Sequence, residues 1–576
     1  MRLEEYWGVG PKTSERLRES LGAERAVEAI ESADVRALTE AGISRGRATR
    51  ILRRANGGDG MAMLGTRDAR NVYDELLSRA ASHAVTRHAA DRIRVLTPLS
   101  DRDEADERLD EVLDARDAWR ALDDDAREAV RDAFETYDEA GGTERASVRA
   151  ALALRDAGLG EEFDALYGLD DDALREALRA LGRVTDGSVG AGADERLDRL
   201  RSRLEDARRL ERGAFDVLDE VRDAGVRSLE DFEGAVVEYV ARETDLTRDD
   251  VRAAAADDVV DAADFVSATL RALAADLQSR AADREATVAA ELEASIEAAR
   301  SDVDAAVAAV DEVAFVLSLA RFTDAYDLSR PELVEDGLAV EGARNLSLDG
   351  AVQPITYAVG DHSLGVGELP SGDRVTVLTG ANSGGKTTLL ETLCQVTLLA
   401  SMGLPVPADR AQVGRFDAVV FHRRHASFNA GVLESTLRSI VPPLTGEGRA
   451  LMLVDEFEAI TEPGRAADLL NGLVQLTVDR GALGVYVTHL ADDLSPLPSQ
   501  ARTDGIFAEG LTQELELRVD YQPRFGTVGK STPEFIVSRL VANAGSRAER
   551  GGFEALAAAV GEEAVQRTLS DARWRS

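Results

Sequence analysis

The sequence predicts a multidomain protein: an N-terminal α-helical hairpin module, a long α-helical region and a C-terminal α/β domain with a phosphate-binding loop. Three observations support this fold class. Residues 1–57 hold two glycine turns between short helical stretches, residues 61–329 are almost all helix formers, and residues 330–576 alternate strand-like and helical runs. Because 576 residues are too many for one hydrophobic core, about three domains are expected.

The composition is strongly acidic and poor in lysine. Asp and Glu number 107 against 68 Lys and Arg, the formal net charge is −39, and the lysines are Lys12, Lys386 and Lys530 alone. The acidic residues are spread along the chain, which favours a protein surface adapted to strong salt, as in a haloarchaeon, over a site for basic partners. At about 1 M salt the Debye length is only about 3 Å, so this charge does not exclude DNA as a partner.

Cysteine content and hydropathy limit the remaining classes of protein. Cys394 is the single cysteine, which excludes an intramolecular disulfide and a cysteine-based zinc site. Residues 1–7 have no apolar signal core, and no uninterrupted apolar run reaches the ~18 residues of a membrane span. We therefore expect a cytoplasmic protein without a membrane partner.

The N-terminal module contains a motif that suits nucleic acid. Residues 6–17 predict a helix-hairpin-helix unit, and residues 38–48 predict a degenerate second copy. A glycine turn at a helix start exposes backbone N–H groups, which can bind a phosphate without reading base sequence. We expect DNA binding here; the alternative is a small helical module for protein binding. The residues expected at the DNA interface are Gly8, Val9, Gly10, Lys12, Arg45 and Arg47.

The region from 61 to 329 predicts helices and no catalytic site. Residues 56–60 are rich in glycine and predict a linker to this region. Residues 200–221 and 262–319 are long, polar and sparsely apolar, which predicts extended antiparallel helices or arms instead of a compact core.

The stretch from 379 to 388 fits the phosphate-binding loop pattern G-x-x-x-x-G-K-[ST]. A strand-like run, residues 374–379, precedes the loop and a helical run follows it, which is the context that the motif requires. Lys386 would reach the β- and γ-phosphates of a nucleotide, and Thr387 would hold Mg²⁺. The residues expected around the nucleotide are Gly380, Ala381, Asn382, Ser383, Gly384, Gly385, Lys386, Thr387 and Thr388.

Two further apolar runs end in polar residues suited to the same site. Residues 450–454 predict a buried strand followed by Asp455 and Glu456, and residues 483–488 predict another followed by His489. Ligands of open α/β sheets bind at the carboxyl ends of the strands. We expect Asp455 to support Mg²⁺, Glu456 to orient or deprotonate the attacking water, and His489 to sense the γ-phosphate.

Other elements complete the predicted α/β domain. Strands are expected at 338–340, 355–359, 417–421 and 514–519, and helices at 432–440, from 464 to about 479, and twice in the tail.

These motifs together resemble the ATPase domain of the MutS family. The family loop T-G-P-N-x-G-G-K-[ST] corresponds to residues 379–387, with Ala381 in place of proline, and residues 403–408 are similar to its G-x-x-V-P-A. Asp455-Glu456, Thr488-His489 and residues 526–531 fall where the family has its D-E, T-H and G-x-x-x-S elements. The resemblance covers about 330–545.

The resemblance implies a Mg²⁺-dependent ATP hydrolase that binds double-stranded or branched DNA as a homodimer. In such dimers a serine-containing segment of one subunit completes the ATP site of the other, and Ser427 is the candidate here, although Glu434 stands two positions further from the serine than in the family pattern. No F-x-E motif occurs before residue 340, and residues 461–464 are closer to the subfamily that lacks mismatch reading, so mismatch reading is not expected. Too little chain follows Ser531 for the C-terminal nuclease domain of some relatives.

The predicted function is therefore a clamp-like DNA-binding ATPase of repair or recombination, with ATP and Mg²⁺ as cofactors. One alternative is a MutS-related clamp that acts on ribosomes or RNA, against which the hairpin module argues. Another is a structural dimeriser without hydrolysis, against which the presence of Lys386 and Glu456 argues.

Overall fold

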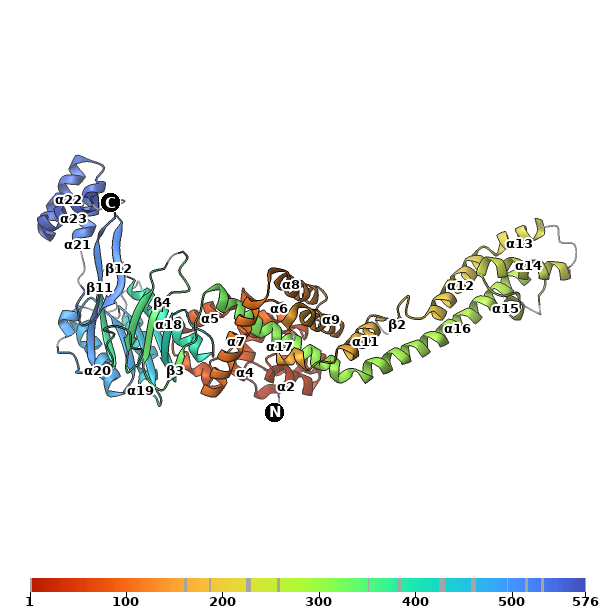
Figure 1. Ribbon diagram of the computed structural model, residues 1–576, viewed down its shortest axis with the longest axis horizontal. Coiled ribbons are helices and arrows are strands. Elements are labelled where there is room, and N and C mark those ends of the chain that lie inside the picture. Colours follow the sequence, from red (N-terminus) through yellow and green to blue (C-terminus); the bar gives the residue numbers. More distant parts are fainter. Residues whose placement is uncertain are drawn as a thin grey trace. The chain divides into compact units, whose positions relative to one another are not determined.

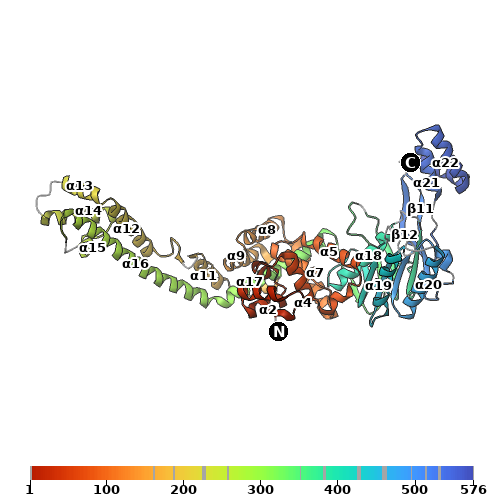
Figure 2. The ribbon, with the colours of Figure 1, turned by 180° about the vertical axis from the view of Figure 1, so that it is seen from behind.

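The computed structural model describes residues 3–159, 163–185, 188–223, 229–255, 259–350, 352–380, 385–423, 430–456, 463–494, 496–512, 516–529 and 533–574 (Figures 1 and 2). The chain forms two compact units. One unit joins Met1–Arg127 to Asp311–Ser576, and the other is Glu128–Val310. The division predicted at residues 57 and 330 differs from this grouping and stays a prediction.

The N-terminal helices form a small core around two matching turns. The elements are η1 (Leu3–Glu5), α1 (Pro11–Leu21), α2 (Ala23–Glu31), α3 (Val35–Glu40) and α4 (Arg45–Asn56). Gly8 and Gly42 adopt φ angles of 82° and 80°, a region that favours glycine, and each begins the turn that precedes α1 or α4. The apolar residue of each turn, Val9 or Ile43, is buried in the shared core.

The segment expected to be a linker is instead a packed turn. Residues Gly58–Met63 form the 3₁₀ helix η2, and a Cβ on Gly60 would lie 2.1 Å from the Pro98 carbonyl oxygen. Arg53 of α4 donates a hydrogen bond to the Arg94 carbonyl at 2.7 Å, and Val95 completes the hairpin core. The hairpin module is therefore docked on the helices that follow it.

The helices after the hairpin module are α5 (Arg67–Ala81), α6 (Arg87–Arg94) and α7 (Arg102–Ala121), of which α5 and α7 contact the C-terminal α/β region. Thr66, which caps α5, donates to the Phe421 carbonyl at 2.6 Å and accepts from the Phe421 N–H at 3.2 Å. Arg92 of α6 is paired with Glu312 of α17 (Arg300–Ala325) at 2.9 Å.

The second unit is built on two long antiparallel helices, as the polar stretches predict. Arg284 of α16 (Ala262–Ala298) donates to Asp194, which caps the start of α12 (Glu195–Arg212), whereas Arg208 near its end bonds Gln278. Figure 1 shows the two helices side by side. The other elements of this part of the chain are α8 (Asp124–Glu139), α9 (Glu144–Leu154), the π-helix η3 (Arg155–Leu159), α10 (Asp164–Tyr167), α11 (Asp171–Leu181), β1 (Val184–Thr185), β2 (Ser188–Val189), α13 (Ala214–Asp223), α14 (Leu229–Thr244) and α15 (Arg248–Ala253).

The C-terminal α/β region contains two sheets. The larger sheet has the order β12-β11-β6-β10-β9-β8, in which neighbours run parallel except for the antiparallel edge strand β12. Its strands are β6 (Val375–Gly380), β8 (Ala418–His422), β9 (Ala450–Asp455), β10 (Leu483–Val487), β11 (Ala501–Leu511) and β12 (Leu517–Arg524). The smaller sheet has the order β3-β7-β4-β5, with strands β3 (Glu332–Val334), β4 (Leu338–Ala343), β5 (Ile355–Val359) and β7 (Arg410–Gly414).

The helices of this region are α18 (Lys386–Ser401), α19 (Ala430–Thr445), α20 (Pro463–Asp479), the 3₁₀ helix η5 (Ala491–Leu494) and the tail helices α21 (Pro533–Asn543), α22 (Arg547–Val560) and α23 (Glu562–Trp574). The expectation of two tail helices is wrong, because Gly561 separates α22 from α23 within one helix-forming stretch. Across the described residues, no helix has both the length and the apolar character needed to cross a membrane.

Candidate nucleotide site and hairpin surface

The predicted phosphate loop lies between a buried strand and a helix. β6 ends at Gly380, and α18 begins at Lys386 with Gly385 as its left-handed N-terminal residue, at a φ of 73°. The N-cap residue Gly385 has no side chain to cap this helix, and such a helix start suits an anion. Four of the predicted nucleotide-binding residues, Ala381, Asn382, Ser383 and Gly384, lie outside the described residues.

The lysine and threonine of the motif point to different partners. Lys386 is only 4% exposed, and its Nζ donates to the Gly380 carbonyl at 3.0 Å, so its charge is held directly at the loop. The Thr387 hydroxyl donates to Oδ2 of Asp455 at 2.5 Å. This contact joins the start of α18 to the end of β9, 68 residues later in the sequence.

Sheet register brings the predicted catalytic residues to the same edge. Val487 of β10 pairs with Asp455 of β9 on one side and with Leu378 of β6 on the other. Glu456 follows β9 with a φ of 41°, which an L-residue seldom adopts, and its N–H donates to the Val487 carbonyl at 3.1 Å. His489 Nε2 lies 2.8 Å from Glu456 Oε1. Glu456 is thus held through its backbone N–H by Val487 and through its carboxylate by His489.

The oxygen ligands present suit a magnesium ion that is shared with a phosphate. Within the described ranges, no group of three or more His, Cys, Asp or Glu side chains could hold a metal ion. The hydroxyl of Thr387 and the carboxylate of Asp455 are oxygen donors, and Mg²⁺ typically takes one or two protein ligands together with waters and substrate phosphates. These two residues therefore fit Mg²⁺ that arrives with a nucleotide.

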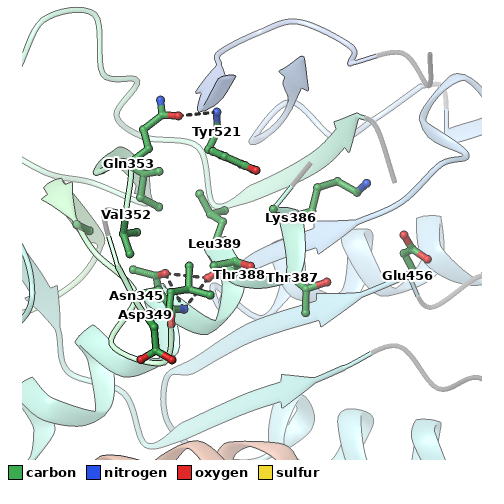
Figure 3. Close-up of a pocket in the computed structure, with 15 residues that line it drawn as sticks. Asn345, Asp349, Val352, Gln353, Lys386, Thr387, Thr388, Leu389, Glu456 and Tyr521 are labelled. Carbon is green, nitrogen blue, oxygen red and sulfur yellow. Dashed lines mark hydrogen bonds between the residues drawn. The ribbon is translucent and has the colours of Figure 1, made fainter. Parts of the chain in front are cut away.

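A pocket of about 480 Å³ opens beside the loop and is lined by residues that the sequence reasoning missed (Figure 3). The Tyr521 ring lies over Gly385, where a Cβ would come within 2.7 Å of the ring. The Tyr521 N–H donates to Gln353 at 3.2 Å, and Asn345 donates to the Thr388 carbonyl. An aromatic residue shortly before the glycine turn at 526 was the available signal for Tyr521; nothing in the sequence marked Gln353 or Asn345.

A buried charged network lies beneath the loop. Asp504 of β11 is fully buried, and its carboxylate accepts hydrogen bonds from Arg502, from the Tyr357 hydroxyl at 2.9 Å and from the Gly526 N–H at 3.1 Å. Burial raises the pKa of Asp504, with the charge of Arg502 opposing it, and burial raises the pKa of Tyr357 well above its usual value. The network therefore ties β5, β11 and the Gly526 turn together.

The same network reaches the phosphate loop through glycines. The Thr379 hydroxyl donates to the Asp504 carbonyl at 3.0 Å and accepts from the Gly529 N–H at 2.6 Å. A Cβ on Gly529 would lie 2.8 Å from Gly380 Cα, and one on Gly505 would lie 2.5 Å from the Gly529 nitrogen. Three backbone segments thus approach one another so closely that only glycine fits between them.

The hairpin module presents two helix starts of the kind that bind phosphates. α1 begins after Gly10 and α4 after Ser44, and no side chain caps either helix. By contrast, Asp or Thr side chains cap α5, α6, α7, α11 and α12. α4 carries five arginines and no acidic residue: Arg45, Arg47, Arg50, Arg53 and Arg54. This concentration of positive charge stands out in a chain of net charge −39.

The residues predicted to contact DNA differ in whether other residues of the protein already bind their side chains. Lys12 is exposed, whereas Arg45 pairs with Asp91 at 3.4 Å. Arg47 donates to the Gly8 carbonyl at 3.1 Å and to the Thr13 hydroxyl at 2.7 Å, so it bridges the two hairpins. The structure brings Gly8, Val9, Gly10 and Arg47 together at the first hairpin. The remaining predicted site residue, Ser427, lies outside the described residues.

Comparison with known proteins identifies the relatives of the chain. A family model described as a SAM-like helix-hairpin-helix tandem matches residues 5–56. The chain is 44% identical over 232 residues to the DNA-binding protein MutS2 of Pyrococcus furiosus, a match that covers 40% of each chain. It is also 32% identical over 178 residues to the endonuclease MutS2 of Thermus thermophilus, covering 30% of this chain and 23% of that protein.

A third relative, the DNA mismatch repair protein MutS of Natronomonas pharaonis, is 29% identical over 229 residues, which covers 37% of this chain and 25% of that protein. The chain therefore spans less than half the length of these relatives. The chain is a homologue of the MutS2 and MutS proteins and carries an N-terminal tandem of helix-hairpin-helix motifs.

Proposed function

We propose that this protein is a DNA-binding ATPase of the MutS type, which couples ATP binding and hydrolysis to clamp-like engagement of DNA without reading base mismatches. The observation that carries the proposal is the 2.5 Å contact between Thr387 and Asp455. It joins a phosphate-loop hydroxyl to an acidic strand end, and a nucleotide-bound Mg²⁺ needs both.

The chemistry is assigned to the residues around this contact. Lys386, now on the Gly380 carbonyl, would bind the β- and γ-phosphates, and the uncapped start of α18 would receive a phosphate oxygen. Thr387 and Asp455 would hold Mg²⁺, which neutralises phosphate charge when bound. Glu456 would orient or deprotonate the attacking water, and His489, which contacts that carboxylate, would sense the γ-phosphate.

Tyr521 would cover the base of the nucleotide. Its ring forms one wall of the pocket next to Lys386 and Thr387. Aromatic rings stack on any base because every base has a π-face. Asn345 and Gln353 line the same pocket, and their amides are bonded within the protein, Asn345 to Thr388 and Gln353 to the Tyr521 N–H, so they would hold this part of the pocket in place.

DNA binding is assigned to the hairpin module. Two uncapped helix starts and an arginine-rich helix suit the phosphates of a duplex. A named DNA-binding relative, the Pyrococcus furiosus MutS2, supports the same partner. Such contacts bind the backbone, so we expect little preference for sequence.

The active species is proposed to be a homodimer in which Ser427 completes the partner's ATP site. The test mixes Lys386→Ala subunits with Ser427→Ala subunits. With shared sites, one site of the mixed dimer holds both lesions and the other holds neither, so mixing restores part of the lost activity. A monomer in the presence of ATP, or normal hydrolysis by Ser427→Ala homodimers, would contradict this arrangement.

The central experiment measures ATP hydrolysis in molar KCl with duplex, branched, mismatched and single-stranded DNA. We expect Mg²⁺-dependent turnover, stimulation by duplex or branched DNA, and no extra stimulation by a mismatch. Stimulation by ribosomes, together with copurified ribosomal RNA, would favour the alternative of a ribosome-acting clamp. Absence of turnover with every nucleic acid would contradict the ATPase assignment.

A further inference from the structure

One aromatic side chain of the hairpin module stays outside its core. Tyr6 is buried and its hydroxyl donates to Glu31, but the next residue, Trp7, is 57% exposed. Trp7 directly precedes the Gly8–Gly10 turn. Among the large hydrophobic side chains described in this module, it is the one left exposed. An exposed indole contributes little to folding, and its ring is accessible to a ligand.

The Trp7 ring is held in place by α4. The Arg54 guanidinium lies over it at 5.5 Å from the ring centroid, a cation–π contact that covers one face. Arg47, Ile51 and Arg54 share one side of α4 at helical spacing, and this side meets the first hairpin: Arg47 bonds the Gly8 carbonyl, and a Cβ on Gly8 would lie 3.2 Å from Ile51. Arg54 forms no ion pair with any described residue, so its charge remains available.

The exposed ring and the predicted phosphate site are close neighbours. Trp7 and Gly10 are separated by three residue steps, or at most about 11 Å of extended chain. α1 begins after Gly10 without a side-chain cap. One short turn therefore combines a flat aromatic surface, the Arg54 cation and a helix start without a side-chain cap. Single-strand binding surfaces use this combination: aromatic rings stack on bases while cations follow the backbone.

We propose that Trp7 is a stacking platform that directs the hairpin module to DNA in which a duplex adjoins unpaired bases, such as a fork, a gap or a single-stranded extension. This inference rests on the proposed DNA binding. Inside a continuous duplex, each base face is covered by its neighbours, so an indole finds a free base face only where stacking is interrupted. The phosphates of the adjoining duplex would occupy the two uncapped helix starts.

The test compares two DNA probes that share one duplex sequence. The first is a closed circular duplex, which has neither ends nor loops, and the second is the same circle with a short single-stranded extension. We expect the parent chain to bind the extended probe more tightly, by about 5- to 150-fold, which is the value of one base–aromatic stack. Trp7→Ala should remove this preference and leave the affinity for the closed circle unchanged, whereas Trp7→Phe should keep part of it.

Two controls separate stacking from damage to the fold. The melting temperature of Trp7→Ala and its affinity for the closed circle report whether the module remains folded. Tyr167→Ala removes another exposed aromatic ring, 68% exposed in the second unit, and should change neither affinity. Indole fluorescence that is quenched by the extended probe in the parent but not in Trp7→Phe would show the stack directly.

The outcomes distinguish this inference from the function on which it rests. If the parent binds neither probe, the DNA-binding function itself fails, and the inference fails with it. If the parent binds both probes equally, or if Trp7→Ala weakens both equally, DNA binding stands and the stacking platform is overturned.

Discussion

The predicted phosphate loop and the hairpin module use the same local feature in opposite surroundings. In each, a glycine turn leads into a helix whose first turn has no side-chain cap. At the phosphate loop the charged groups are buried: Lys386, Asp455 and Glu456 are 4%, 2% and 8% exposed. At the hairpins Lys12, Arg45 and Arg47 are exposed.

This difference in burial separates two kinds of phosphate recognition. Buried charges interact strongly and are little screened by salt, so they can fix one small ligand in the geometry that a reaction requires. Exposed charges and backbone N–H groups bind a polymer along its length and respond to salt through released counterions. We therefore expect the buried charges to govern nucleotide hydrolysis and the exposed charges to govern binding along DNA.

The largest effect is expected from the buried acid. Glu456→Gln should retain nucleotide binding and slow turnover by about 10²–10⁴-fold, because the amide cannot accept the proton of the attacking water. Lys386→Ala should instead weaken nucleotide binding. Single-turnover hydrolysis together with equilibrium binding of ATP separates these effects. Equal turnover by Glu456→Gln and the parent would remove this residue from the mechanism.

Loss of the buried network beneath the loop should come next. Asp504→Asn leaves Arg502, 8% exposed, without its main carboxylate, and breaking a buried pair in this way costs about 3–5 kcal/mol of stability. Urea unfolding, monitored through the fluorescence of a nucleotide analogue, would measure this loss of stability. Arg518→Gln is a matched control, because its ion pair with Glu509 is largely exposed and should contribute under about 1 kcal/mol. Equal losses in the two variants would contradict the assigned role of burial.

A smaller effect is expected at the base-binding wall. Tyr521→Ala should weaken ATP binding by about 1–3 kcal/mol, the usual value of a base–aromatic stack. The rate at which bound ATP is hydrolysed should change little. Tyr521→Phe should behave like the parent, since the ring and not the hydroxyl covers Gly385. Calorimetric titration with ATP provides the measurement, and a parent-like Tyr521→Ala would place the base elsewhere.

The smallest effect should appear at the exposed surface. Lys12→Ala should lower the slope of log affinity against log salt by about one and weaken binding evenly across DNA sequences. ATP affinity should depend far less on KCl, because its site is buried. Affinities for ATP and for DNA, measured over a series of KCl concentrations, test this difference. Equal salt slopes for the two ligands would contradict it.

The sequence predicted the parts of the fold that have strong local signals. Buried parallel strands such as β6, β9 and β10 are continuous apolar runs, so their positions and the convergence of Thr387, Asp455, Glu456 and His489 followed from spacing. The two hairpins followed from their glycine turns, and the family match confirms them.

Other parts depend on partners that are distant in the sequence. β11 was missed because Arg502, Asp504 and two glycines interrupt its apolar pattern, and these charges are satisfied by contacts with β5, Asp373 and the Gly526 turn. The 56–60 segment has the composition of a linker, but the packing of Gly60 on Pro98 decides its structure. Asn345 and Gln353 reach the pocket by tertiary folding alone.

The close approach of Gly380, Gly505 and Gly529 also sets an order of events during synthesis. The chain leaves the ribosome from its N-terminus, so β6 appears more than a hundred residues before β11 and the Gly526 turn that cover it. Until then, one side of β6 lacks its neighbour in the sheet and remains an open edge that could pair wrongly. The nascent chain can therefore form the hydrogen bond between Thr379 and Gly529 only after the roughly 150 residues between them have been added.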